Sequence, residues 1–216
     1  MSQELQRAKD SFCIIAGHGR NGPNERRGIM IGPNKILTAL HDLRQNEAFE
    51  IFLPEAYTPK ISINAVKIDA DEGLDAAVLT LRHSIAETWV QPAGRKYISP
   101  LETRRVITDV TGQIEDNGLT RNTKTSKALA DIFYESDMPM NAADFEVLTT
   151  DAPLNSDHSG SPIVDKQGHV TAMVSGVIDG NKGLGSLIMR GLGGKTQDVF
   201  AARQNSLARF VNEHAL

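Results

Sequence analysis

Residues 28–41 read GIMIGPNKILTALH: two short apolar runs on either side of a Gly-Pro-Asn turn, with a histidine just after the second. Short runs of this kind, separated by turn residues, predict paired antiparallel strands. The pattern recurs along the chain, and predicts strands at residues 11–17, 28–31, 35–39, 49–53, 61–68, 76–81, 106–110, 129–134, 145–150, 162–164, 170–174 and 185–189. Many short strands with turns between them indicate an antiparallel barrel or sandwich rather than βαβ units.

Four further segments lie outside these strands. Residues 2–10 predict a short helix, and residues 83–104 are weakly patterned and suit a connector between two halves. The polar stretch 115–128 predicts an exposed, mobile loop. In the tail, residues 196–214, apolar side chains at 200, 207 and 211 have the spacing of one face of an amphipathic helix.

Composition sets limits on the function. The 216 residues are 40% hydrophobic and 23% charged, as in ordinary globular proteins, and their net charge is −4. No segment concentrates basic residues, which argues against nucleic acid as a partner. No apolar run approaches the roughly 18 residues that span a bilayer, so we expect no membrane partner.

The N-terminal residues and the single cysteine bear on location. Residues 1–10 contain no apolar core of a signal peptide, which favours a cytoplasmic protein or one exported without a classical signal peptide. Cys13 is the only cysteine, so no internal disulfide forms, which fits a reducing compartment. It lies in the apolar run FCIIA and is predicted to be a buried structural thiol.

Three segments carry residues suited to acyl transfer. His41 follows a predicted strand, Asp75 precedes one, and Ser159 lies in the polar turn NSDHSGSP of residues 155–162. A serine nucleophile needs a neutral imidazole within hydrogen-bond reach, and a buried carboxylate that fixes the imidazole tautomer. Each residue alone is weak evidence. Their order along the chain, His then Asp then Ser, is that of chymotrypsin-like folds.

The motifs around these residues resemble those of a known family. Residues 37–41 (LTALH) and 74–79 (LDAAVL) resemble the histidine and acid motifs of trypsin-like serine peptidases. Residues 150–162 (TDAPLNSDHSGSP) resemble the nucleophile segment of the HtrA (Deg) group. Two later segments, GHVTAMVS at 168–175 and GLGSLI at 183–188, are similar to its cleft-lining strand and pocket wall. The resemblance extends over residues 11–214.

This resemblance implies an all-β, chymotrypsin-like fold of two perpendicular six-stranded antiparallel β-barrels with a C-terminal helix. The whole chain, 1–216, would be a single peptidase domain without a PDZ domain. Its parts would be a first barrel at about 11–82, a connector at about 83–104, a second barrel at about 105–192 and a helix at about 196–214.

The resemblance also implies a serine endopeptidase that acts on a protein or peptide and needs no cofactor or metal. His41, Asp75 and Ser159 would be the catalytic triad, with the main-chain N–H groups of Asp157 and Ser159 as the oxyanion hole. The implied substrate-binding residues are Pro153, Leu154, Val174, Ser175, Gly176 and Leu187. The pocket positions among them are uncharged, so we expect a small or medium apolar residue before the cleaved bond. Whether the enzyme has an activating partner or forms a homo-oligomer stays open.

Asp157 departs from the family pattern, which has glycine two residues before the serine. Aspartate reaches left-handed conformations only at some energetic cost. Three interpretations therefore stay open: an active enzyme, a pseudoprotease that serves as a peptide-binding or scaffold module, and a zymogen-like enzyme whose 153–158 loop orders on binding a partner. His158, beside the serine, is not expected to be a second base, because neighbouring side chains on a turn usually point apart.

Overall fold

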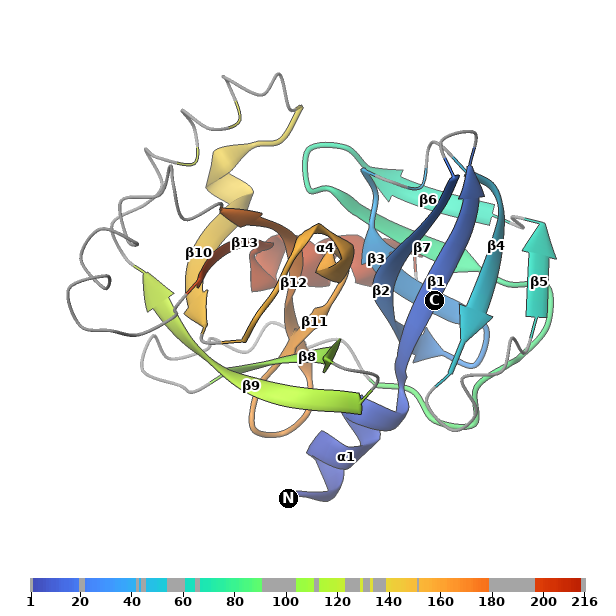
Figure 1. Ribbon diagram of the computed structural model, residues 1–216, viewed down its shortest axis with the longest axis horizontal. Coiled ribbons are helices and arrows are strands. Elements are labelled where there is room, and N and C mark those ends of the chain that lie inside the picture. The colour runs from blue at the N-terminus through green and yellow to red at the C-terminus, as the bar shows by residue number, and fades with distance from the viewer. Residues whose placement is uncertain are drawn as a thin grey trace.

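The computed structural model describes residues 2–19, 22–41, 43, 46–53, 61–64, 67–90, 104–110, 113–122, 129, 133, 139–150, 152–178 and 197–214. Two antiparallel β-sheets lie side by side in this part of the chain (Figure 1). Helix α1 (Gln3–Asp10) precedes the first sheet, and helix α4 (Gln204–His214) packs against a strand of each sheet, β7 and β12. No helix in these ranges is long and apolar enough to cross a membrane.

The first sheet has seven strands in the order β5-β4-β1-β2-β3-β7-β6. Their bounds are β1 (Phe12–Gly19), β2 (Gly22–Gly32), β3 (Lys35–Ala39), β4 (Asn46–Phe52), β5 (Ile61–Asn64), β6 (Lys67–Asp71) and β7 (Ala76–Thr80). The predicted strand at 61–68 is two strands. Because β5 pairs with β4 and β6 pairs with β7, they form opposite edges of the sheet, which therefore has seven strands rather than six.

The second sheet is a closed six-stranded barrel in the order β10-β13-β12-β11-β8-β9. Its strands are β8 (Arg104–Val110), β9 (Gln113–Asn122), β10 (Phe145–Thr150), β11 (Pro162–Val164), β12 (Val170–Ile178) and β13 (Gln197–Ala202), and the short helix η2 (Ala142–Asp144) leads into β10. Pairing of β9 with β10 closes the barrel. Together with α4, the two sheets confirm the expected antiparallel, chymotrypsin-like fold.

Residues 115–122 are a strand, so the predicted mobile loop is wrong over that range. β9 pairs with β8 along its length and with β10 at its end, and this pairing satisfies main-chain groups whatever the side chains are. Residues 123–128 lie outside the described ranges.

The predicted strand at 129–134 is also wrong at Leu129 and Phe133, which are helical; residues 130–132 and 134 lie outside the described ranges. Both are buried, four residues apart, which is the spacing of one helix face. The Phe133 ring packs edge-on against Phe145 and Phe200. The predicted strand at 185–189 lies outside the described residues.

The tail begins as a strand, so the predicted helix at 196–214 is too long. Residues of β13 alternate between two cores: Val199 and Ala201 face the interior of the second barrel, and Phe200 and Ala202 face the core between the sheets. This period of two is that of a strand. The helix proper is α4, whose Leu207 and Phe210 complete the core between the sheets.

The apolar core has three parts, and these place the functional turns. One part lies within the first sheet, and it includes the fully buried Cys13. Burial raises the pKa of the Cys13 thiol, as expected for a structural cysteine. A second part fills the closed barrel, and the largest joins both sheets and both helices. The last residues of β3, the first residues of β7 and the turn before β11 meet at the junction of the two sheets.

Candidate active site

Strand pairing brings His41 and Asp75 together. β3 ends two residues before His41, β7 begins directly after Asp75, and their end residues Ala39 and Ala76 are paired. The Leu40 N–H donates to the Asp75 carbonyl at 3.1 Å, which ties the two chain segments together beyond the last strand pair. Asp75 has a φ of 51°, a left-handed conformation that aspartate adopts more readily than most residues. The turn thus directs its carboxylate towards His41.

Both oxygens of the Asp75 carboxylate bind His41. Oδ1 accepts from the His41 main-chain N–H at 2.8 Å, and Oδ2 lies 2.9 Å from the ring atom Nδ1. Asp75 is 2% exposed, whereas the His41 side chain is 34% exposed. A buried carboxylate at Nδ1 holds the proton on that nitrogen and leaves Nε2 as the acceptor. The pair can therefore present a basic nitrogen to the cavity.

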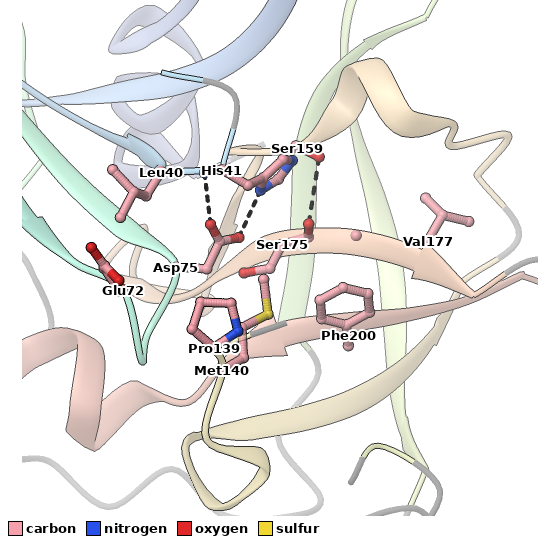
Figure 2. A pocket seen from close by; sticks show the side chains of 11 residues that line it. Leu40, His41, Glu72, Asp75, Pro139, Met140, Ser159, Ser175, Val177 and Phe200 are labelled. Carbon is pink, nitrogen blue, oxygen red and sulfur yellow. Dashed lines mark hydrogen bonds and ion pairs between the residues drawn. The ribbon is translucent and has the colours of Figure 1, made fainter. Parts of the chain in front are cut away.

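Ser159 enters the same site from the second barrel. It follows the short helix η3 (Ser156–His158) and is almost fully buried. Figure 2 shows the His41 ring between Asp75 and Ser159, and all three residues line one cavity of about 460 Å³. The Ser159 Oγ donates to the Ser175 carbonyl at 3.5 Å, a long hydrogen bond. The three predicted triad residues are thus gathered in one place.

Gly160 allows the turn at Ser159 to pass close to the first sheet. Its φ is 86°, and a Cβ there would lie 1.9 Å from the Arg27 carbonyl oxygen. Main-chain bonds fix the turn on both sides: Gly160 N–H donates to the Val174 carbonyl at 2.8 Å, and Arg27 N–H donates to the Ser159 carbonyl at 2.9 Å. Only glycine fits this backbone position.

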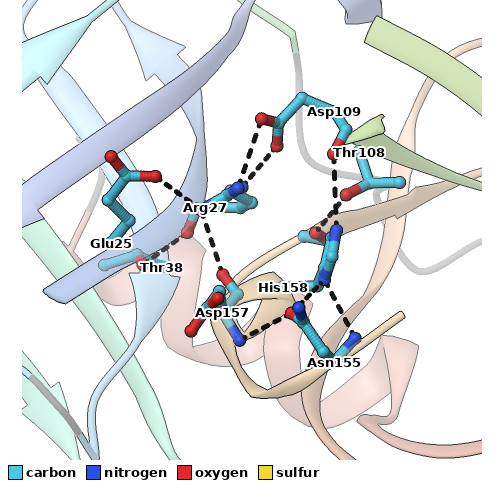
Figure 3. Close-up of polar contacts among 9 residues, drawn as sticks. Glu25, Arg27, Thr38, Thr108, Asp109, Asn155, Asp157 and His158 are labelled. Carbon is cyan, nitrogen blue, oxygen red and sulfur yellow. Dashed lines mark hydrogen bonds and ion pairs between the residues drawn. The ribbon is translucent and has the colours of Figure 1, made fainter. Parts of the chain in front are cut away.

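The predicted oxyanion hole is not assembled from both of its donors. In the turn η3, the Asp157 main-chain N–H donates to the side-chain oxygen of Asn155 at 3.0 Å (Figure 3). This N–H is therefore engaged by a neighbouring residue of its own loop. Asn155 was not singled out from the sequence, although an asparagine two residues before a turn position is a known source of such side-chain bonds.

His158 is part of the support of this loop and does not line the cavity of Ser159. Its Nε2 lies 3.4 Å from the Asp109 carbonyl, and its Nδ1 lies 3.0 Å from the main-chain nitrogen and 2.6 Å from the side-chain oxygen of Asn155. Burial and then the nearby Arg27 charge lower the pKa of His158. These contacts keep it away from the role of a second base.

The cavity contains two of the six predicted substrate-binding residues, Ser175 and Gly176. Leu154 and Val174 are buried in the interior of the second barrel, and Pro153 is exposed outside the cavity lining. Leu187 lies outside the described residues. Sequence reasoning missed the other lining residues, namely Leu40, Glu72, Pro139, Met140, Val177 and Phe200.

Gly176 and Phe200 together shape the cavity floor. They are paired across β12 and β13, and a Cβ on Gly176 would lie 2.5 Å from the Phe200 ring. The glycine therefore makes room for an aromatic ring supplied by the neighbouring strand. The sequence did offer a signal for this strand, the continuous apolar run at residues 199–202, which suits a buried strand. The interpretation of the whole tail as a helix obscured it.

Comparison with known proteins identifies a family and similar folds. Residues 27–173 match the family model described as a trypsin-like peptidase domain. Two solved structures of the protease Rv3671c from M. tuberculosis are similar at 14% identity. The active form has a TM-score of 0.65, covering 97% of this chain and 83% of the other, and the inactive form has 0.64, covering 99% and 93%. At this identity the likeness shows the fold. No curated protein sequence matches the chain.

Proposed function

Because the chain belongs to the family of trypsin-like peptidase domains, we propose that it is a serine endopeptidase with His41, Asp75 and Ser159 as its catalytic triad. The observation that carries this proposal is the two-point contact between the Asp75 carboxylate and His41, beside a cavity that Ser159 also lines. The nucleophile segment further supports an HtrA-like enzyme. Its substrate is then a protein or peptide.

In the proposed mechanism, His41 Nε2 takes the proton of Ser159 as its Oγ attacks the carbonyl carbon of the substrate. The charge on the former carbonyl oxygen is stabilised by the main-chain N–H of Ser159 and, once the 156–157 peptide has turned away from Asn155, by that of Asp157. His41 then gives its proton to the leaving amine, and an acyl-enzyme remains. Water, deprotonated by His41, releases the acid and restores the Ser159 hydroxyl. Asp75 stabilises the imidazolium in both steps.

The substrate main chain would bind along residues 175–177 of β12. β11 pairs with β12 as far as Met173, whereas β13 pairs with β12 on to Ile178. In the described part of the chain, this leaves the side of β12 opposite β13 as an edge that an extended peptide can join. The cavity beside it is lined mainly by apolar side chains such as Met140 and Phe200. It suits an apolar substrate side chain, and a small or medium apolar residue before the cleaved bond remains our proposal.

The Asp157–Asn155 bond favours a second candidate, in which the domain binds peptides without cleaving them. The same bond suits a zymogen-like enzyme that turns its loop when a substrate, an activating partner or a second copy binds. In a resting enzyme, cleavage rises once the loop is turned. In a scaffold module, peptide binding is not followed by acylation.

A fluorophosphonate probe separates these functions because it requires both an activated serine and an oxyanion site. We expect the probe to label Ser159 in the native protein and to leave Ser159→Ala unlabelled. The melting temperatures of the two proteins should be nearly equal, since one hydroxyl is removed. A native protein that binds peptides but is neither labelled nor able to cleave them would be a scaffold module.

A further inference from the structure

Arg27 reaches from the first sheet to the loop that carries the nucleophile (Figure 3). It lies on β2, and its side chain is 7% exposed. Its Nε and Nη2 donate to the two carboxylate oxygens of Asp109 on β8, the latter at 3.2 Å. Its Nη1 donates to the Asp157 carbonyl at 3.2 Å and lies 3.7 Å from the exposed carboxylate of Glu25. One guanidinium therefore links both sheets to the loop.

The main chain of Arg27 holds the same loop at a second point. Its N–H donates to the Ser159 carbonyl at 2.9 Å, and its own carbonyl accepts from the buried Thr38 hydroxyl at 2.7 Å. Arg27 thus binds the carbonyl groups of Asp157 and Ser159, on either side of His158. The two sides of residue 157 are therefore held differently: Arg27 binds the Asp157 carbonyl, whereas among the described bonds the Asp157 N–H is held by Asn155 alone.

The peptide that must turn to complete the oxyanion hole is the one between residues 156 and 157. Turning a single peptide changes ψ of the residue before it and φ of the residue after it, and leaves the flanking peptides nearly in place. The Asp157 carbonyl belongs to the next peptide, which Arg27 holds. The contacts of Arg27 are therefore compatible with both orientations of the Asp157 N–H.

We infer that Arg27 is a positioning residue for the oxyanion hole, an inference that rests on the proposed peptidase function. It anchors the peptide after Asp157, so that the turned N–H of Asp157 arrives at a defined distance from Ser159. Asp109 holds the guanidinium in the orientation that reaches the loop, because a bidentate arginine–carboxylate pair fixes both distance and plane. Lysine has no fork that can bind Asp109 and the Asp157 carbonyl at once.

The test compares Arg27→Gln and Arg27→Lys with a matched control. Arg104 forms a similar bidentate pair with Glu146, at 2.5 and 3.0 Å, with both side chains 8% exposed. That pair joins β8 to β10 and has no contact with the loop among its described bonds. Arg104→Gln should lower the melting temperature and leave kcat, per folded protein, unchanged.

For Arg27→Gln we expect kcat to fall at least tenfold with KM within twofold of the native value, because the oxyanion contact is made chiefly in the transition state. Arg27→Lys should melt closer to the native temperature than Arg27→Gln does, since it keeps a charge beside Asp109. Its kcat should stay as low as that of Arg27→Gln. Recovery of both by lysine, or an unchanged kcat in Arg27→Gln, would overturn the inference.

Amide hydrogen exchange provides a readout that does not depend on turnover. In Arg27→Gln, residues 155–160 should exchange faster than in the native protein, whereas Arg104→Gln should leave them unchanged. If the native protein proves unreactive towards the fluorophosphonate, the proposed peptidase fails, and exchange still decides whether Arg27 anchors the loop. Equal exchange in this segment for all three proteins contradicts the anchoring role.

Discussion

The main-chain N–H of Asp157 donates to the side-chain oxygen of Asn155 at 3.0 Å, in the turn that leads to Ser159. An N–H bound in this way cannot also meet the oxyanion of a substrate. Among the described residues, the only non-glycine with a positive φ is Asp75, so Asp157 rests at negative φ. Turning the 156–157 peptide by roughly half a turn would bring Asp157 to positive φ, where a Cβ is unfavourable.

Asp157→Gly should raise the basal rate of peptide cleavage. A left-handed conformation costs a residue with a Cβ about 1–2 kcal/mol, and glycine avoids this cost, so a factor of roughly 5 to 30 in the competent population is available. The measurement is the initial rate with a peptide substrate. Asp157→Ala is the control, because it removes the carboxylate and keeps the Cβ. An equal gain in both variants would assign the effect to charge, and no gain in the glycine variant would contradict the strain argument.

Asp75→Asn tests the contact with His41. An amide presents a donor where the carboxylate has an acceptor, so one of the two hydrogen bonds to His41 is lost and the ring tautomer is no longer held. We expect kcat to fall by about 10⁴-fold while the fold is retained. The matched control is Asp71→Asn in the same turn, since Asp71 accepts from the Leu74 N–H at 3.0 Å and has no contact with His41 among its described bonds. A comparable loss in the control would mean that the shape of the turn, and not the His41 contact, matters.

The strands nearest the site could be predicted from the sequence because their signals are local. The expected strands 35–39, 145–150 and 162–164 agree with β3, β10 and β11, where short apolar runs are bounded by turn residues. His41 and Asp75 each adjoin such a run, but it is their order along the chain and the resemblance of residues 37–41 and 74–79 to trypsin-like motifs that single them out. Ser159 stands out by its polar turn and by the resemblance of residues 150–162 to the nucleophile segment of the HtrA group. The positive φ of the next residue, Gly160, is a finding of the structure.

What the sequence did not reveal depends on contacts between distant segments. Arg27 and Asp109 lie 82 positions apart, and neither has an unusual neighbourhood in the sequence. Phe200 became a cavity residue through pairing of β12 with β13, and β9 is a strand because two other strands pair with it. A polar strand such as β9 and a buried arginine such as Arg27 have no periodic apolar signal. Strand pairing identifies the first, and the contacts between the two sheets identify the second.

Gly160→Ala should destabilise the protein and remove the reactivity of Ser159. A Cβ at this position would lie 1.9 Å from the Arg27 carbonyl and 2.7 Å from the Thr38 hydroxyl, and the φ of 86° is strained for alanine. Overpacking and left-handed strain together predict a loss of about 2–4 kcal/mol in the free energy of unfolding. Urea unfolding measures the loss. Gly32→Ala, whose nearest contact would be an ordinary 3.5 Å to a flexible lysine, is the control and should lose much less. A Gly160 variant as stable as the control would contradict the close approach.

His158 should make the stability of the protein depend on pH in a defined window. Burial, with the Arg27 charge as the second cause, lowers the pKa of His158 below its ordinary value of 6.5. Above about pH 6.5 the histidine is neutral in both the folded and unfolded chains, and its contribution is fully present. As the pH falls below 6.5, the unfolded chain binds a proton that the folded chain refuses, so the free energy of unfolding decreases until the lowered pKa is reached, by at most about 1.4 kcal/mol per pH unit.

His158→Gln isolates this contribution, because glutamine does not titrate and retains a side chain that can hydrogen-bond near Asn155. Urea unfolding of both proteins should be measured at pH 7.5 and pH 5. The native protein should lose more stability than the variant between these two values, and the difference between the two proteins should shrink or reverse on acidification. The remaining titratable groups are the same in both proteins, so their contributions to the free energy of unfolding cancel in the comparison. If the two proteins lose the same free energy of unfolding over this interval, His158 does not resist protonation in the fold, and its buried place beside Asp109 and Asn155 is not what links stability to pH.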